Sequence, residues 1–258
     1  RPTEPAELGE RCYQFEDVHF AYNESEVLRG ISFQTQPGTM TAIVGTSGSG
    51  KSTIAKLMAG FWDVTSGTVR FGGQDIRNIP FGQLMDEISY VAQDNFLFDK
   101  SIRENIRMGI PDASDGEVEA AAKAANCHDF IMQLEQGYDT MAGDAGDRLS
   151  GGERQRITIA RAILKQASVI ILDEATAYAD PENEALIQQA ISKLVAGKSL
   201  IVVAHRLNTI RNADQILVVA NGEIVGRGIQ KELLQNCPLY RKMWQDYAGS
   251  IEGGTEDV

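Results

Sequence analysis

The sequence of 258 residues has few cysteines and a deficit of positive charge. Cys12, Cys127 and Cys237 stand far apart without paired spacing, which indicates neither a disulfide framework nor a zinc site and fits a reducing cytosol. Lys and Arg number 24 against 36 Asp and Glu, giving a net charge of −12. Because an acidic surface of this kind repels polyanions, we expect no nucleic acid partner.

Long apolar runs are missing as well. The longest, VIIL, LIVVA and ILVVA, are far shorter than the roughly 20 residues of a membrane-spanning helix, so the sequence predicts no span. Residues 1–10, RPTEPAELGE, are polar and lack the apolar core of a signal peptide. We interpret them as a linker, and the start without Met indicates a piece of a longer polypeptide. Residues 249–258 are polar and glycine-rich, and we expect a disordered tail there.

What the sequence does contain is a change of hydrophobic pattern near Met40. Before it, YQFEDVHFAY and VLRGISFQTQPG alternate apolar and polar residues, which predicts half-buried antiparallel strands. After it, TAIV, VIIL, SLIVVA and QILVVA run without alternation, which is typical of strands in a parallel sheet covered on both faces. Between about residues 94 and 168 the periodicity is helical. We therefore predict an α/β domain over residues 11–248, with a mainly parallel sheet, an N-terminal antiparallel β subdomain and a helical subdomain at 94–168.

Residues 45–52, GTSGSGKS, match the pattern GxxxxGK[ST] of the phosphate loop (P-loop), between an apolar strand and a helical stretch. Glycines let backbone N–H groups approach phosphate oxygens, Lys51 reaches the β- and γ-phosphates, and the Ser52 hydroxyl can hold Mg²⁺. The core is therefore predicted to be that of a P-loop nucleoside triphosphatase. The predicted phosphate site is Gly45, Thr46, Ser47, Gly48, Ser49, Gly50, Lys51, Ser52 and Thr53.

Polar side chains follow two of the apolar strands. Asp173 and Glu174 end VIIL, and His205 ends SLIVVA. Ligands of open α/β sheets bind at the carboxyl ends of the strands, so these side chains are expected to face the phosphates. Asp173 is predicted to hold Mg²⁺, Glu174 to act as the base toward the attacking water, and His205 to contact the γ-phosphate and that water. The alternatives are that Asp173 and Glu174 are solvated loop acids and that His205 is structural. The presence of the P-loop argues against both.

A second glycine pair lies in DRLSGGERQRITIARAIL, where Ser150, Gly151 and Gly152 precede a helical stretch. Backbone N–H groups at a helix start can bind an anion, and Ser150 adds a hydroxyl donor. The alternative is an ordinary capping box, because Glu153 follows Ser150 by three residues. The residues alone leave both interpretations open.

The segment LSGGE resembles the signature sequence of ATP-binding cassette (ABC) proteins, and its place between the P-loop and VIILDE matches that family. The resemblance covers about residues 12–247. It implies ATP and Mg²⁺ as cofactors, ATP hydrolysis, and a head-to-tail dimer around two ATP molecules. In such a dimer Ser150, Gly151 and Gly152 complete the ATP site of a second cassette, identical or related.

The resemblance assigns two further residues. VHFAYNESEVLRGISF resembles the strand with the adenine-stacking aromatic, here Tyr22, and ISYVAQDNFLF resembles the segment whose glutamine, here Gln93, contacts Mg²⁺ and water and senses the membrane domain. RNIPFGQLMDEIS and FDKSIRENI look like the exporter branch, in which the cassette follows a transmembrane domain on the same polypeptide, at the cytoplasmic face of the membrane.

Two departures from the exporter pattern stand out. Residues 177–180 read AYAD where many exporters have Ser-Ala-Leu-Asp, and GDAGD replaces a Gly-Glu-Arg-Gly element before the signature. AYADPENE resembles exporter-type transporters that handle siderophores, while substrate and direction stay open. The alternative of another class is a nucleotide-gated regulatory cassette with little hydrolysis, against which Glu174, His205 and the intact signature argue. A third alternative, a soluble cassette ATPase, would carry a long coiled-coil insert or a duplicated cassette, and this sequence contains neither.

Overall fold

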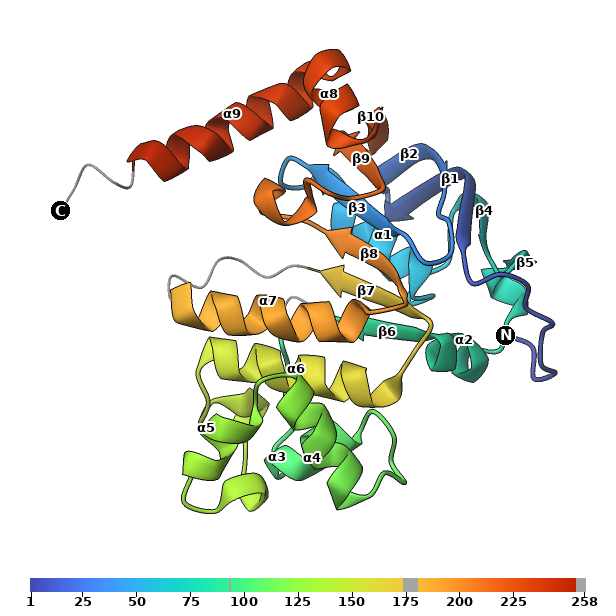
Figure 1. Ribbon diagram of the computed structural model, residues 1–258. Coiled ribbons are helices and arrows are strands. Elements are labelled where there is room, and N and C mark those ends of the chain that lie inside the picture. The colour runs from blue at the N-terminus through green and yellow to red at the C-terminus, as the bar shows by residue number, and fades with distance from the viewer. Residues whose placement is uncertain (93, 174–180, 254–258) are drawn as a thin grey trace. The chain divides into compact units, whose positions relative to one another are not determined.

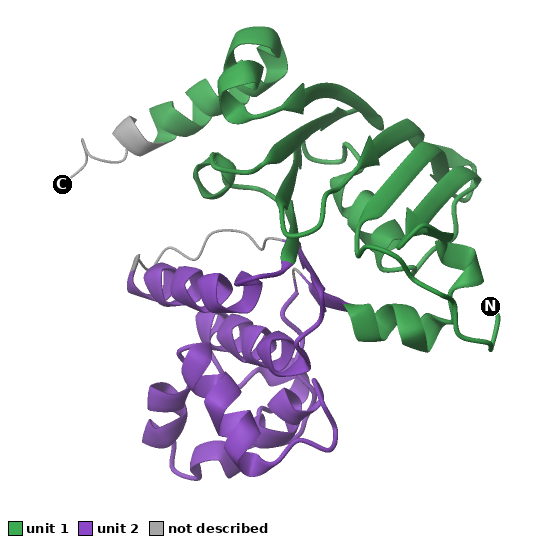
Figure 2. Cartoon of the chain, turned by 45° about the vertical axis from the view of Figure 1, so that its right-hand side comes forward, with its two compact units in different colours: residues 1–87, 199–258 green, residues 88–198 purple. Residues whose placement is uncertain are grey.

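The computed structural model describes residues 1–92, 94–173 and 181–253, and Figure 1 labels its helices and strands. The chain divides into two compact units, coloured separately in Figure 2. Unit 1 comprises residues 1–87 and 199–258, and unit 2 comprises residues 88–198. No helix in the described part of the chain is long and apolar enough to cross a membrane.

Unit 1 begins with an antiparallel sheet in the order β2-β1-β4-β5. Its first two strands confirm the predicted half-buried antiparallel pair, with Phe15 and Phe33 stacked on the buried face at 4.5 Å between ring centroids. Asn23, at φ 58°, makes the tight turn between them, a conformation that asparagine tolerates better than most residues. The strands are β1 Tyr13–Tyr22, β2 Ser25–Gln34, β4 Ser66–Phe71 and β5 Gln74–Asp75.

The second sheet of unit 1 contains three of the four continuous apolar runs. Its strands lie in the order β10-β9-β3-β8, with β3 parallel to both β8 and β9 and with β10 antiparallel to β9. The side chains of β3 and β8 are almost fully buried, as the prediction of covered parallel strands requires. The bounds are β3 Met40–Gly45, β8 Ser199–Val203, β9 Gln215–Ala220 and β10 Glu223–Gly228.

Helix α1 packs against β3 and β8 through Ile54, Leu57 and Met58, which are buried. The remaining helices of unit 1 are shorter or lie at its C-terminal end. The bounds are α1 Lys51–Met58, α2 Phe81–Glu87, α8 Gln230–Asn236 and α9 Pro238–Gly253, with 3₁₀ turns at Ile76–Asn78 and Leu207–Ile210.

The described residues near both ends of the chain are held in ordered structure. Arg1 donates to the Gly60 carbonyl at 2.7 Å, and the Ala6 backbone exchanges hydrogen bonds with the Gln83 amide at 2.9 and 2.8 Å. The expected linker 1–10 therefore lies along unit 1. At the other end α9 continues to Gly253, past residue 249 where we expected a tail to begin.

Unit 2 contains a pair of parallel strands, β6 and β7, and helix α6 packs against β6. The long helix α6 packs against α3, α4 and α7, and its Ile157, Ile159 and Ala160 are fully buried. Between residues 94 and 168 the described part contains helices and one isolated bridge, Ser101 to Met141. The bounds are β6 Ile88–Val91, β7 Val169–Asp173, α3 Ile102–Arg107, α4 Asp115–Ala124, α5 His128–Gln133, α6 Gly151–Lys165 and α7 Pro181–Val195, with 3₁₀ turns at Gly137–Asp139 and Asp144–Gly146.

Candidate active site

The P-loop joins the end of β3 to the start of α1 and needs its glycines. Gly48 and Gly50 have φ values of 75° and 107°, which side chains rarely adopt. A Cβ on Gly45 would lie 2.1 Å from the Val219 carbonyl oxygen, and one on Gly50 would lie 2.7 Å from a Leu28 methyl group. The path of the loop therefore excludes side chains at these positions.

The start of α1 is suited to an anion. Its N-cap residue, Gly50, supplies no side-chain cap in the described structure, so the first-turn N–H groups depend on other acceptors. Lys51 is only 7% exposed, and its Nζ donates to the Gly45 carbonyl at 2.7 Å, which folds the side chain back over the loop. The Ser49 hydroxyl is buried and has no hydrogen-bond partner within the described residues. A cation, N–H groups and a hydroxyl at one helix start match the requirements of a phosphate chain.

Three aromatic rings lie beside this helix start. The Tyr22 hydroxyl is 3.3 Å from Thr53 Oγ1, so the residue predicted to stack on the base is bonded to the first turn of α1. Its ring meets Phe20 at 4.7 Å and Trp62 at 5.5 Å between centroids, in both cases edge to face. Trp62 is 50% exposed and was not predicted from the sequence. The signal was the aromatic pair Phe61 and Trp62 directly after the P-loop helix.

His205 lies at the same sheet edge as the P-loop. Strands β3 and β8 are parallel and Ile43 pairs with Val203, so the loops after both strands leave the sheet at one edge. The Ala204 N–H donates to the Ile43 carbonyl at 2.9 Å, which holds the chain to β3 up to the residue before His205. The His205 side chain is exposed.

Unit 2 carries the predicted metal carboxylate. Asp173 is the last residue of β7 and is 7% exposed, and its Oδ2 accepts a hydrogen bond of 3.4 Å from the Tyr90 hydroxyl on the neighbouring strand β6. Gln93 and Glu174 lie outside the described residues. The Asp173 carboxylate and the Ser52 hydroxyl are hard oxygen donors of the kind that Mg²⁺ prefers.

The SGGE segment forms the start of α6, and its capping box is complete. Ser150 Oγ accepts from the Glu153 N–H at 3.2 Å, and Glu153 Oε1 accepts from the Ser150 N–H at 3.0 Å. A hydroxyl that accepts one bond still has its own hydrogen to donate. Ser150 is exposed, so capping and phosphate binding, the two interpretations left open by the sequence, are chemically compatible.

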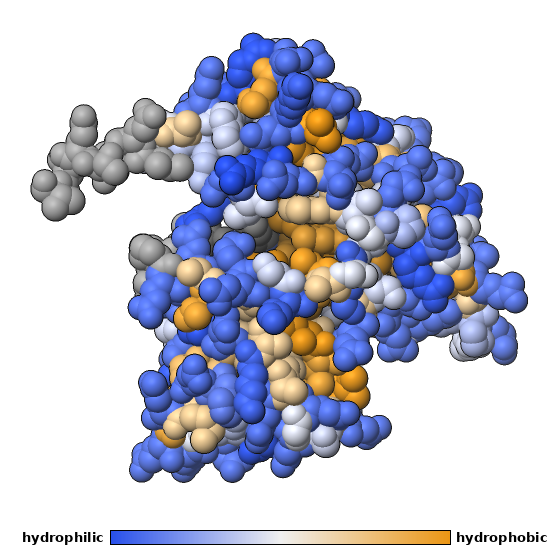
Figure 3. All heavy atoms as spheres, in the orientation of Figure 1, coloured by the Kyte–Doolittle hydropathy of each residue, from blue (hydrophilic) through white to orange (hydrophobic). Residues whose placement is uncertain are grey.

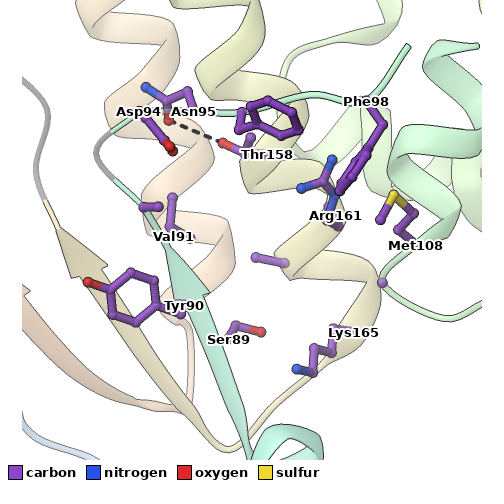
Figure 4. A pocket seen from close by; sticks show the side chains of 14 residues that line it. Ser89, Tyr90, Val91, Asp94, Asn95, Phe98, Met108, Thr158, Arg161 and Lys165 are labelled. Carbon is purple, nitrogen blue, oxygen red and sulfur yellow. Dashed lines mark hydrogen bonds between the residues drawn. The ribbon is translucent and has the colours of Figure 1, made fainter. Parts of the chain in front are cut away.

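A cavity of about 270 Å³ opens in unit 2 beside the segment that follows β6 (Figure 4). Thr158 on α6 donates to Asn95 Oδ1 at 3.4 Å across it. Arg161 on the same helix donates to the Asn105 carbonyl at 2.9 Å, and burial lowers the pKa of its guanidinium. The cavity therefore has a cationic, hydrogen-bonded wall.

Figure 3 shows a largely hydrophilic surface on which atoms of apolar residues gather in several places. Large residues that are at least 40% exposed follow β6 and α3, namely Phe96, Phe98, Met108 and Ile110. Exposed apolar groups of this size commonly mark an interaction surface.

The model of the family described as "ABC transporter" matches residues 28–177, more than half of the chain. The chain belongs to the ABC transporter family, and it corresponds to the ATP-binding domain of exporter-type members. A solved structure of a bacterial Atm1-family ABC exporter with ATP bound has a TM-score of 0.90 at 41% identity, covering 96% of this chain and 44% of that one.

Two curated relatives match this chain with similar identities. ATP-binding cassette sub-family B member 6 of Xenopus tropicalis is 48% identical over 94% of this chain and 29% of its own length. The mycobactin import ATP-binding/permease protein IrtA of Mycolicibacterium smegmatis (strain ATCC 700084 / mc(2)155) is 49% identical over 92% of this chain and 28% of its own length. The chain thus spans less than a third of either relative.

Proposed function

We propose that this chain binds and hydrolyses ATP to drive a transporter. The observation that carries the proposal is the helix start of α1, where buried Lys51 is held over an uncapped N-terminus beside Tyr22. The loop supplies donors for the phosphates, and the ring supplies a face for the base. Membership of the ABC transporter family makes that nucleotide ATP.

Ser52 and Asp173 would hold Mg²⁺, which neutralises phosphate charge when it is bound. Lys51 and the loop N–H groups hold the β- and γ-phosphates, and Glu174 takes the proton of the attacking water. His205 orients the γ-phosphate and that water, and Gln93 would contact both Mg²⁺ and the water. Charge that develops on the equatorial oxygens is stabilised by Lys51 and by donors from a second cassette.

The second cassette is the first proposed partner. Its Ser150 hydroxyl and the N–H groups of Gly151 and Gly152 face the nucleotide of the opposite copy, so two ATP molecules lie between two chains arranged head to tail. The capping box supports this role because it fixes Ser150 and leaves its hydroxyl hydrogen free to donate.

A transmembrane domain is the second partner, on the same polypeptide and with the cassette at the cytoplasmic face of the membrane. Both relatives extend far beyond the part that this chain matches, and one is named an ATP-binding/permease protein. The exposed side chains of Phe96, Phe98 and Met108, which line the unit 2 cavity, are the contact we propose for it. For the transported substrate, the similarity to a mycobactin importer and the AYADPENE segment both favour a siderophore.

ATP turnover with and without Mg²⁺ tests this function. Glu174→Gln should retain ATP binding and lower turnover on the order of a hundredfold, because the general base is lost. Glu182→Gln, on α7, is the matched control and should leave turnover unchanged. Turnover in Glu174→Gln equal to that of the parent chain would contradict the assignment of the base, and a parent chain without Mg²⁺-dependent turnover would favour the regulatory cassette.

A further inference from the structure

The second glycine of the SGGE segment faces a side chain from another helix. A Cβ built on Gly152 would lie 3.0 Å from Cγ of Asn183, 3.2 Å from its Oδ1 and 3.3 Å from its Nδ2. Separations this short are tighter than nine in ten real Cβ contacts, so a side chain at residue 152 would require Asn183 to shift by a few tenths of an ångström. Asn183 belongs to the first turn of α7, so a side chain of α7 reaches α6 at the position where residue 152 has no side chain.

Arg156, one turn further along α6, holds Asn183 in this place. Its Nη2 donates to Asn183 Oδ1 at 3.1 Å, and its Nη1 donates to the Asn126 carbonyl at 2.8 Å. Arg156 is 5% exposed, and its guanidinium lies 4.9 Å from the centre of the Phe130 ring. Asn126 in turn donates to the Leu186 carbonyl on α7 at 3.0 Å. An arginine buried among neutral acceptors is costly, and its planar fork fixes the partners it bonds.

The same capping box without this contact occurs elsewhere in unit 2. Helix α4 begins with a complete box, and Gly116 is its second residue, as Gly152 is in α6. A Cβ on Gly116 would meet only Ser114 Oγ, at 3.9 Å. The box therefore has room for a side chain at its second position, and the requirement for glycine at residue 152 comes from Asn183.

We propose that Asn183 is a positioning residue, oriented by Arg156, that fixes the start of α6 against α7. The proposal rests on the proposed function, in which residues 150–152 complete the nucleotide site of a second cassette. Asn183 then sets the direction of the N–H groups that serve the partner's nucleotide. It also ties them to the helix that begins seven residues after Glu174 in the sequence.

A thermal double-mutant cycle without nucleotide tests the contact. Gly152→Ala should lower Tm by about 5 °C, because the added methyl group overpacks the space beside Asn183. In the Asn183→Ala background, Gly152→Ala should leave Tm unchanged or raise it. The space beside residue 152 is then unoccupied, and alanine has a higher helix propensity than glycine. Gly116→Ala is the matched control and should not lower Tm. Equal losses from Gly152→Ala in both backgrounds would overturn the contact.

ATP turnover tests the positioning role. Gly152→Ala should lower kcat about tenfold with KM for ATP within about twofold of the parent chain, because the P-loop of the same chain is untouched. The double variant should be no slower than Asn183→Ala alone. If residue 152 lacks a side chain only for the partner's nucleotide, Gly152→Ala would cost the same in both backgrounds, which overturns the proposal. If the thermal cycle gives the predicted result but the parent chain hydrolyses no ATP, the contact between Asn183 and residue 152 is supported and the proposed function is overturned.

Discussion

At the scale of single residues, Lys51 shows how much the P-loop depends on one side chain. The cation is buried at the start of α1 and bonded to the Gly45 carbonyl, so it faces the loop before any phosphate enters. Its donors and charge are not replaced by any neighbouring loop residue, since residues 45–50 contain only glycine, serine and threonine. The strength of ATP binding should therefore follow this residue.

We expect Lys51→Ala to weaken ATP binding by about a hundredfold or more, because a charge-assisted hydrogen bond to phosphate is lost. Equilibrium dialysis with labelled ATP measures this directly. Lys56→Ala, in the last turn of the same helix, removes the same charge and should bind normally. Tight ATP binding by Lys51→Ala would contradict the phosphate-loop assignment.

The thiols give a second prediction at this scale. Burial raises the pKa of Cys127 to about 12, and burial together with the nearby Glu10 carboxylate raises the pKa of the half-buried Cys12. A thiol reagent at pH 8 should therefore react slowly with Cys12 and not with buried Cys127 or Cys237, and all three should react in urea. The rate at which Cys12 reacts should continue to rise as the pH is raised above the ordinary pKa of a cysteine thiol, because the pKa of Cys12 is raised. Fast reaction of two thiols in the native chain would contradict this packing.

At the scale of elements, hydrophobic pattern and turn chemistry were sufficient for much of the fold. The alternation in YQFEDVHFAY predicted β1, and the uninterrupted runs predicted β3, β7, β8 and β9, because burial on one or two faces dictates those patterns. Trp62 beside Tyr22 could not be predicted, since pattern does not report which distant side chains meet. The contact of Asn183 with Gly152 was missed for the same reason, although the capping box of α6 was one of the two interpretations that its residues left open.

The contact of β1 with α1 is a testable case. The Tyr13 hydroxyl is fully buried and donates to the Met58 carbonyl, in the last turn of α1, at 2.7 Å. Tyr13→Phe should reduce the free energy of unfolding by about 1–3 kcal/mol, because a buried carbonyl loses its partner. Urea unfolding followed by circular dichroism measures the change. Tyr247→Phe, on the partly exposed α9, is the control, and an equal effect of both substitutions would contradict the role of this bond.

At the scale of the whole molecule, the chain holds a phosphate loop and a second helix start for which we propose anion binding. The P-loop lies in unit 1 and the SGGE segment in unit 2, and the family resemblance assigns them to nucleotides bound by different copies. A single chain would then present two half-sites. Dimerisation upon ATP binding is therefore the central claim, and it does not require the substrate to be known.

The experiment we would do first is to measure the solution mass of Glu174→Gln with and without Mg²⁺-ATP, by light scattering on a sizing column. We expect a rise from the monomer mass of 28.2 kDa to twice that value when nucleotide is present. Adding Ser150→Arg should prevent the rise while ATP still binds, since Ser150 serves the opposite copy. A variant Glu174→Gln that binds Mg²⁺-ATP and stays at the monomer mass would contradict the account.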